Sequence, residues 1–295
     1  MRVATHDGSL HADEVFAVAA LSLLGEPVEI VRSRDEAVLA ACDARVDVGF
    51  RSDPATGDFD HHQREGAGER PNGIRYASFG LVWRHHGTRI CGGDADVAER
   101  VDQSLVQGVD ANDTGQEIMA PLLDGVRPMT VSGVIGTFNP TWEEELTRAE
   151  EDRRFEEAVA LAAGILEREI ASAHAGQRAR RLVEEAIARA VDPRVVVLEH
   201  NIPWKEVVVT QAPDALFVVY PKRHGWGLEA VPRELGSFDN RRDLPQAWAG
   251  LDGPELARLT GVDGALFCHA RRFLAVARSR AAIDALAAQA LDGAG

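Results

Sequence analysis

The sequence has few cysteines, no long apolar run and a shortage of positive charge, and each of these excludes a class of protein. Only 3 cysteines occur among 295 residues, and no two form a CxxC pair. Neither a disulfide framework nor a thiolate zinc site is therefore expected. The apolar stretch 15–24 is too short to span a bilayer, and no basic, cleavable leader precedes it. We expect a cytoplasmic protein with no membrane partner.

Positive charge is scarce relative to negative charge. The 47 acidic and 32 basic residues give a net charge of −15 at pH 7. Such a chain repels a polyanion on average, so long duplex DNA held by an extensive basic face is not expected as a partner. A short RNA or oligonucleotide, or a small phosphate compound, is compatible with this charge if a local metal and arginine site attracts it.

Strands and helices alternate in the first half of the chain. Apolar patterns predict strands at 2–5, 28–31 and 46–48, with helices at 11–24 and 37–41 between them. This alternation predicts a mostly parallel sheet. Because the carboxyl ends of parallel strands meet at one crevice, several residues distant in sequence are expected to converge there. These residues are His6, His11, Asp13, Asp47 and Asp60.

The remainder of the chain predicts a helical connection followed by a second α/β region. The length suits one large domain or two ordinary ones. We expect a metal-binding domain at 1–140, a helical linker at 141–192 and a C-terminal substrate domain at 193–295. The further predicted helices are 77–86, 96–106, 143–174, 177–190, 255–259 and 281–291. The further predicted strands are 195–198, 207–210, 216–220, 228–231 and 265–269. Residues 119–137 are predicted as a loop.

Clusters of acids and histidines in the first 115 residues predict a metal site. The most conspicuous is Asp60-His61-His62-Gln63. Carboxylate oxygens with imidazole nitrogens, and no thiolate, suit Mn²⁺, Mg²⁺, Fe²⁺ or Zn²⁺. Any one of these side chains alone is more often a surface, cap or core residue, and Asp13 and Glu14 fit first-turn acids favoured by the helix dipole. Their joint order is what indicates a dinuclear metal site.

The joint order of the motifs resembles a known family. His6-x4-His11-x-Asp13-Glu14 is followed by Val46-Asp47-Val48-Gly49, then by Asp60-His61-His62-Gln63, and then by Val109-Asp110-x2-Asp113. This order is similar to the melanocyte proliferating gene exonuclease family, also labelled metal-dependent protein hydrolases, a branch of the DHH phosphoesterase superfamily. The likeness continues at 201–205, 217–221, 226–232 and 261–269, so it covers nearly the whole chain.

The resemblance implies a fold, a cofactor and a set of site residues. The implied fold is an N-terminal, mostly parallel α/β domain of DHH-phosphoesterase type with a smaller C-terminal α/β substrate domain. The implied cofactor is two divalent metal ions, best matched by Mn²⁺. Asp60 and His62 would be catalytic, with His62 also near the substrate phosphate. The implied metal ligands are His6, His11, Asp13, Asp47, Asp60, His61 and either Asp113 or Asp110, of which the string Asp113-Thr114-Gly115 favours Asp113.

The chain departs from the family pattern near its C-terminus. The family tends to have a glycine-rich string after the His-Ala pair, where this chain has Arg271-Arg272-Phe273. Glycines there would let backbone amides approach a phosphate. His269, Arg271 and Arg272 could bind phosphate by charge instead, or the segment is a strand and turn with solvated arginines. Asp7 beside His6, where an amide residue is usual, is a smaller change.

The leading hypothesis is a Mn²⁺-dependent phosphodiester hydrolase. It would be a 3′–5′ exonuclease that acts on RNA or short oligonucleotides by two-metal hydroxide attack. Two alternatives are a phosphatase or pyrophosphatase acting on a small phosphate compound, and a non-catalytic nucleotide-binding protein. Trp204 and Trp226 would line an open groove if the substrate is a polymer, although tryptophans are more often core residues. The sequence leaves the oligomeric state open.

Overall fold

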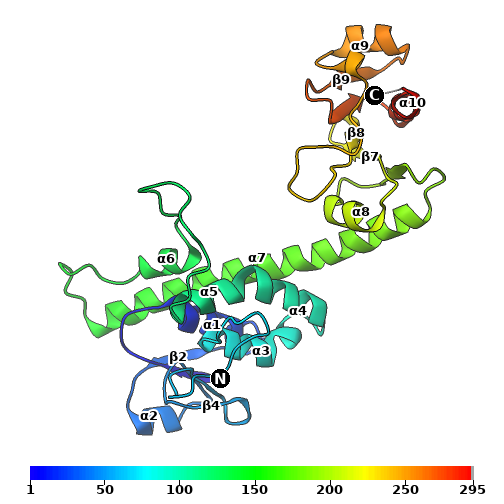
Figure 1. Cartoon of the computed structure of the whole chain (residues 1–295). Helices are drawn as coiled ribbons and strands as arrows, with labels where there is room; N and C mark the ends of the chain where they lie inside the picture. Colours follow the sequence, from blue (N-terminus) through cyan, green and yellow to red (C-terminus); the bar gives the residue numbers. More distant parts are fainter. Residues whose placement is uncertain (294–295) are drawn as a thin grey trace. The chain divides into compact units, whose positions relative to one another are not determined.

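The computed structural model describes residues 1–293 and divides into two compact units (Figure 1). Unit 1 is Met1–His174, and unit 2 begins at Ala175. Within the described residues, each unit contains one five-stranded sheet with helices packed against it. The predicted α/β class is therefore confirmed. None of the helices found in residues 1–293 combines the length and the apolar character that a bilayer crossing requires.

The sheet of unit 1 has the strand order β2-β1-β3-β5-β4. All neighbouring strands are parallel except β4, which runs antiparallel to β5. The parallel sheet expected from the sequence is thus present, but β3 lies two residues earlier than predicted. The two-residue strands β4 and β5 were not predicted, because they are too short to show an alternating pattern. The strands are β1 (Arg2–Thr5), β2 (Glu29–Arg32), β3 (Ala44–Val46), β4 (Ser52–Asp53) and β5 (Asp58–Phe59).

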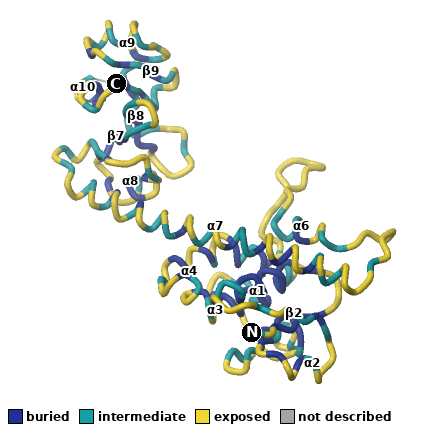
Figure 2. The backbone as a smooth tube through the Cα atoms, turned by 180° about the vertical axis from the view of Figure 1, so that it is seen from behind, coloured by how far each residue is buried: buried dark blue, intermediate teal, exposed yellow. Residues whose placement is uncertain are grey.

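Helix α1 (Ala12–Ser22) forms the centre of unit 1. Every residue from Ala12 to Leu21 is buried, which Figure 2 shows as a dark segment between the sheet and the other helices. A helix that is apolar on all sides is stable only when it is covered all round. The other helices of the unit are α2 (Glu36–Ala40), α3 (Ser78–Ile90), α4 (Ala95–Val101), α5 (Gln107–Asp113) and α6 (Val131–Gly136), with a 3₁₀ turn η1 (Pro54–Thr56) and a π-helical turn η2 (Asp102–Val106).

Helix α7 (Arg148–Ala188) is continuous, so the predicted break between two helices near residue 175 is wrong. Gly176 lies inside it, and a glycine costs a helix only about 1 kcal/mol relative to alanine. Packing on both sides of this glycine offsets that cost, because Ala173 joins the core of unit 1 and Val183 joins a core of unit 2. The boundary between the two compact units falls within this helix.

The sheet of unit 2 has the strand order β6-β7-β8-β10-β9. Strands β6 and β7 are parallel, and the other neighbours are antiparallel. Unit 2 has two hydrophobic core clusters. The first includes residues of α10, and the second includes residues of α8. The elements are β6 (Val195–Val197), α8 (Lys205–Gln211), β7 (Phe217–Lys222), β8 (Gly225–Ala230), η3 (Gln246–Trp248), α9 (Gly253–Thr260), β9 (Ala265–Cys268), β10 (Leu274–Ala277) and α10 (Arg280–Asp292).

Two segments differ from the sequence prediction in type. Residues 207–210 were predicted as a strand because they are β-branched, but they lie in α8. Trp204, Val207 and Val208 are buried together at helical spacing, so packing overrides the local strand preference. Helix α6 lies within the predicted loop 119–137, and the hydroxyl of Thr130 caps it by accepting a hydrogen bond from the Gly133 amide at 3.0 Å.

Candidate metal centre

The candidate site lies where three parallel strands of unit 1 end. His6 follows β1, Asp47 follows β3, and Asp60 follows β5. Helix α1 begins at Ala12, after the short loop that follows His6. It contributes two buried acids, Asp13 and Glu14. The carboxyl ends of adjacent parallel strands open into one crevice, which explains why residues distant in sequence meet here.

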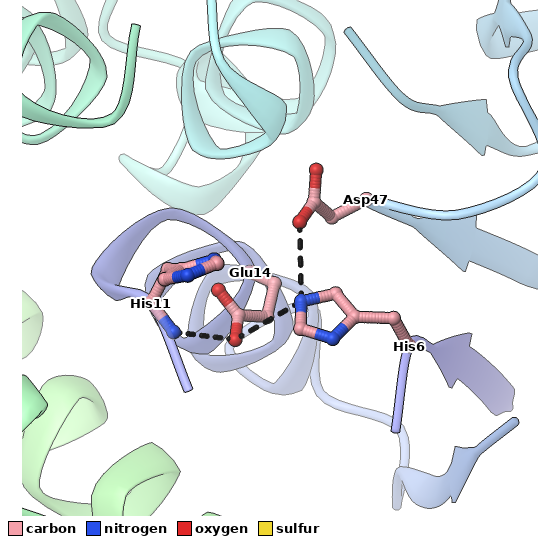
Figure 3. Close-up of side chains that lie close together, drawn as sticks. All are labelled: His6, His11, Glu14 and Asp47. Carbon is pink, nitrogen blue, oxygen red and sulfur yellow. Dashed lines mark hydrogen bonds and ion pairs between the residues drawn. The ribbon is translucent and has the colours of Figure 1, made fainter. Parts of the chain in front are cut away.

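The first group of side chains combines two histidines with two acids. The Nε2 atom of His6 lies 3.3 Å from Oδ2 of Asp47 and 3.5 Å from Oε1 of Glu14 (Figure 3). Oε1 of Glu14 also accepts a hydrogen bond from the backbone N–H of His11 at 2.7 Å. One ligand atom from each of His6, His11, Glu14 and Asp47 lies within 4.8 Å of the others. These atoms could share one cation.

Asp47 reaches the site from an uncommon backbone conformation. Its φ angle is 55°, in the left-handed region that aspartate adopts more readily than most residues. This turn ends β3, while the Asp47 amide still donates to the Phe59 carbonyl at 3.1 Å. The Ser78 hydroxyl donates to Oδ1 of Asp47 at 3.1 Å. Backbone and side-chain contacts together therefore fix the position of this carboxylate.

A second and a third group share residues with the first. The second contains Asp47, His61 and His62, and the third contains His11, Asp13 and Asp113. The Nε2 atom of His61 lies 3.2 Å from Oδ1 of Asp47, 3.8 Å from Oδ2 of Asp13 and 3.1 Å from Oδ2 of Asp113. Since Asp47 and His11 each belong to two groups, the three groups form one continuous cluster.

Asp60 lies beside this cluster, and its two oxygens have protein partners. Oδ2 accepts from the Phe50 amide at 2.6 Å, and Oδ1 accepts from the His62 amide at 3.0 Å. Oδ1 also lies 2.9 Å from Nδ1 of His62. None of the metal-suited groups found among residues 1–293 contains Asp60. Its contacts hold the imidazole of His62, whose side chain is 52% exposed.

Asp110 and Asp113, which the sequence left as alternatives, occupy different surroundings. Asp110 is fully buried, with Oδ2 accepting from Nη1 of Arg70 at 2.8 Å and Oδ1 accepting from the Gly80 amide at 2.9 Å. Its two oxygens are thus bound by protein groups. Asp113 lies one turn later in α5 and belongs to the third group with His11 and Asp13.

The N-terminal turn of α3 binds three of these acids. The Ser78 amide donates to Asp13 at 3.3 Å, its hydroxyl donates to Asp47, and the Gly80 amide donates to Asp110. No side chain of the helix's own N-cap residue supplies these acceptors. Unpaired amides and the helix dipole favour negative charge at this end of a helix.

Burial and proximity shift the pKa values of the clustered groups in opposite directions. Burial, together with the charges of Asp47 and Glu14, raises the pKa of Asp13 well above its usual range. Burial also raises the pKa of Glu14, to about 8. Burial opposes ionisation of Asp47 too, but the adjacent imidazoles of His6, His61 and His62 have the larger effect and hold its pKa well below its usual range.

The two adjacent histidines His61 and His62 have raised pKa values. Burial would lower the pKa of His61, but the adjacent carboxylates of Asp113 and Asp47 raise it to about 10. The adjacent carboxylate of Asp47 raises the pKa of His62 to about 9, against the smaller effect of burial. In the protein alone, both imidazoles therefore carry protons at neutral pH and partly balance the clustered carboxylates.

The buried polar atoms of the cluster fit a divalent cation. Four of them have no hydrogen-bond partner among the described residues: Nε2 of His6, Oδ1 of Asp13, Oε2 of Glu14 and Nε2 of His61. Buried polar atoms are normally satisfied, and a buried charge is normally paired or bound to a metal. A cation among these nitrogens and oxygens would satisfy them, and their chemistry suits Mn²⁺, Mg²⁺, Fe²⁺ or Zn²⁺.

Two residues of the candidate site were not assigned from the sequence. Glu14 belongs to a metal-suited group, and Ser78 positions Asp13 and Asp47 by hydrogen bonds. Glu14 was treated as a first-turn acid of a helix, but it is fully buried and points into the cluster. One signal could have identified it. After its first turn helix α1 is apolar on all sides and is therefore buried all round, so an acid at its third position cannot reach solvent and requires a positive partner.

Of the residues predicted to bind substrate, His62 lies in unit 1, and the other three lie in unit 2 between β9 and β10. Nδ1 of His269 accepts from the Arg271 amide at 3.0 Å, and Arg272 pairs with Asp243 at 2.8 Å. The Arg271 guanidinium lies over the Phe238 ring at 5.1 Å and is exposed. Arg271 is thus the arginine of this turn that offers its charge most freely. Trp204 is a core residue, 5% exposed.

Comparison with known proteins gives the chain relatives along almost its whole length. The human protein named MYG1 exonuclease is 33% identical over 315 aligned residues, which cover 95% of this chain and 82% of the human protein. The mouse protein of the same name is 32% identical over 92% of this chain and 80% of its own length. The MYG1 protein of Chlamydia muridarum is 33% identical over 94% of this chain and 92% of its own length.

A family model covers the same span. It matches residues 2–291, which include both units and every member of the metal-suited cluster. The order of the motifs around His6, Asp47, His61 and Asp113 had already indicated this family. The chain belongs to the MYG1 exonuclease family, described as uncharacterised protein family UPF0160.

Proposed function

We propose that this protein is a metal-dependent nuclease that hydrolyses phosphodiester bonds, acting as a 3′–5′ exonuclease on RNA or short oligonucleotides. The observation that carries the proposal is the set of buried, unpartnered nitrogen and oxygen atoms that follow β1 and β5 and lie in the first turn of α1. The exonuclease name of the human and mouse relatives supports the reaction class. The net charge of −15 favours a short substrate over long duplex DNA.

The cofactor in this proposal is two divalent cations. The mixed nitrogen and oxygen donors suit Mn²⁺, Mg²⁺, Fe²⁺ or Zn²⁺, and the family resemblance favours Mn²⁺. Bound cations would polarise a phosphoryl group and activate water for in-line attack. Asp47 and His11 each belong to two of the ligand groups and would help to hold the cations. The proposed ligands are His6, His11, Asp13, Glu14, Asp47, His61 and Asp113.

His62 and Asp60 act on the substrate side of the cluster. The imidazole of His62 is half exposed, so a substrate phosphate can reach it. A protonated imidazole beside the cations would stabilise the negative charge that develops on phosphate oxygens. Asp60 holds this ring through Nδ1 and so acts as a positioning residue rather than as a ligand.

Unit 2 would bind the body of the substrate. The exposed guanidinium of Arg271 offers a charge for a phosphate. His269 and Arg272 lie in the same turn and are the other proposed contacts. Because Arg272 already pairs with Asp243, substitution of Arg271 is expected to weaken oligonucleotide binding more than substitution of Arg272.

The test is hydrolysis by metal-stripped protein resupplied with Mn²⁺. The substrates are a 5′-labelled short RNA, a DNA of the same sequence, and pyrophosphate. Variants His61→Ala and Asp60→Ala are compared with His85→Ala, which removes an exposed histidine outside the cluster. Mn²⁺ affinity by calorimetry and folding by circular dichroism accompany each assay.

The expected result is a ladder of shortened RNA that requires Mn²⁺. We expect it to be lost in the His61 and Asp60 variants and kept in the His85 variant. The His61 variant should also bind Mn²⁺ more weakly, whereas the Asp60 variant should keep most of its affinity. Phosphate released from pyrophosphate alone would replace the nuclease proposal by the small-phosphate one, and Mn²⁺-independent cleavage would contradict the site.

A further inference from the structure

A cavity of about 320 Å³ adjoins the candidate metal centre and has no part in the proposal above. Two of its lining residues come from ligand-bearing segments. His61 is one of the clustered histidines, and Thr114 follows Asp113 directly. The rest of the lining comes from residues 65–69, Arg75 and Tyr76. A group that occupies this cavity would therefore be a neighbour of the reacting phosphate.

The lining segment is a preformed hairpin rather than a loose loop. The Arg70 amide donates to the Ile74 carbonyl at 2.8 Å, and the Tyr76 amide donates to the Gly68 carbonyl at 3.0 Å. Glu69 and Arg75 pair across it as an antiparallel bridge. The buried side chain of Arg70 anchors the hairpin by binding Asp102 and Asp110.

The chemistry of the lining favours a sugar over a further phosphate. Glu65 and Glu69 are exposed, and neither forms an ion pair within the described chain. Two free carboxylates repel a phosphate but accept hydrogen bonds from hydroxyl groups, and acidic side chains commonly bind the ribose hydroxyls of nucleotides. Arg75 is the arginine in the lining, and one of its N–H groups already donates to the Thr114 carbonyl at 2.9 Å, while His61 belongs to the metal-suited cluster.

The lining offers little for a nucleobase. The aromatic ring available is that of Tyr76, and two guanidinium groups already lie over it, with Cζ of Arg70 at 4.3 Å and Cζ of Arg84 at 4.5 Å from its centroid. Bases are usually bound by stacking on such faces. Recognition in this cavity should therefore depend on the sugar and tolerate any base.

We infer that the cavity beside His61 holds the terminal ribose of an RNA substrate, with the carboxylate of Glu69 accepting hydrogen bonds from its 2′ and 3′ hydroxyls. Glu65 is the second acceptor. This inference rests on the proposed function and names its substrate more closely. The 2′-hydroxyl is the group that distinguishes RNA from DNA at a given position, so the cavity selects ribonucleotides.

The test measures binding and turnover separately. Binding of adenosine 5′-monophosphate and of its 2′-deoxy counterpart is measured by calorimetry on the full chain with Mn²⁺. Turnover is measured on a short RNA and on DNA of the same sequence. The variants are Glu69→Ala and Glu65→Ala, with Glu26→Ala as a control that removes an exposed carboxylate outside the cavity.

The unsubstituted protein should bind the ribonucleotide roughly tenfold more tightly than the deoxynucleotide, as expected for hydrogen bonds to a charged acceptor. Glu69→Ala should reduce this ratio to near one and should weaken deoxynucleotide binding less than ribonucleotide binding, because the deoxynucleotide keeps only its 3′ hydroxyl. The control should keep the ratio. Equal affinities in the unsubstituted protein, or a ratio unchanged by both cavity variants, would overturn the inference. A preserved binding ratio without turnover of either polymer would refute the nuclease proposal and leave the ribose site standing.

Discussion

Substitution of Gly80 by alanine tests the packing that fixes Asp110. A Cβ atom at this position would lie 1.9 Å from Oδ2 of Asp110 and 2.8 Å from Nη2 of Arg70. Alanine normally stabilises a helix by up to about 1 kcal/mol relative to glycine. Here the methyl group must displace a fully buried carboxylate from its bonds to the Gly80 amide and to Arg70.

The expected magnitude follows from those two contributions. Disrupting one partner of a buried ion pair costs about 3–5 kcal/mol, and the helix preference returns up to about 1 kcal/mol. We therefore expect Gly80→Ala to lower the free energy of unfolding by about 2–4 kcal/mol, measured by urea denaturation of the metal-free protein. Asp113 is one helical turn from Asp110, so Mn²⁺ affinity should fall as well.

Gly108→Ala is the matched control. It lies in α5, and the nearest atom that its Cβ would meet is 4.0 Å away on Ile118. This variant should be unchanged or more stable by up to about 1 kcal/mol. If Gly80→Ala were as stable as Gly108→Ala, the described contact between Asp110 and the first turn of α3 would be refuted.

Three further substitutions distinguish ligand, positioning and titration effects. Asp113→Asn should weaken Mn²⁺ binding at least about tenfold, with little change in the stability of the metal-free protein. Asp110→Asn should instead lower the free energy of unfolding by about 1–3 kcal/mol and leave most of the Mn²⁺ affinity. The reverse pattern would exchange the roles of the two acids. The side-chain amide of Asn139 binds both the backbone N–H (2.7 Å) and the carbonyl (2.9 Å) of Leu10. Asn139→Ala should therefore weaken Mn²⁺ binding by roughly 10–100-fold in calorimetry. An unchanged Kd would limit Asn139 to a structural role. Burial and neighbouring positive charges lower the pKa of His86 to about 4, so the unfolded chain binds a proton below pH 6.5 that the folded protein does not. Stability is therefore lost as pH falls from 6.5 towards 4. The free energy of unfolding of His86→Gln, from urea denaturation, should fall less over this window, by up to about 1 kcal/mol because the ring is partly solvated, and equal losses in both proteins would argue against the shift.

The general position of the site could be predicted from the sequence because the relevant signals are local. His6 and Asp47 each follow a short apolar run, and a strand-helix alternation is enough to predict a parallel sheet. The fold then brings the ends of those runs together, whatever the details of packing. Neither the strand bounds nor the identity of the helices that cover the sheet was needed for this step.

The roles of individual acids could not be predicted, since they depend on distant partners. Asp110 and Asp113 are chemically alike and three residues apart, and what separates them is Arg70, 40 residues earlier in the chain. Asp60 differs from a free acid because it accepts a hydrogen bond from the amide of Phe50, a residue in the left-handed region with a φ angle of 55°. Spacing between acids carries no information about such partners.

The strand predicted at 207–210 shows a different limit. Val207, Val208 and Val209 favour a strand by local preference, and nothing in that short stretch indicates a helix. Burial of Val207 and Val208 beside Trp204 decides the outcome. A run of β-branched residues next to a sheet is therefore weak evidence for another strand.

The first turn of α3 connects the acids of the cluster mechanically. Its amides and one hydroxyl bind Asp13 from α1, Asp47 from the end of β3 and Asp110 from α5. A shift of this helix along its axis would carry all three attachment points by the same distance and in the same direction. The three acids should therefore move together when α3 shifts. The geometry of the cluster would then be kept or lost in one step rather than one side chain at a time.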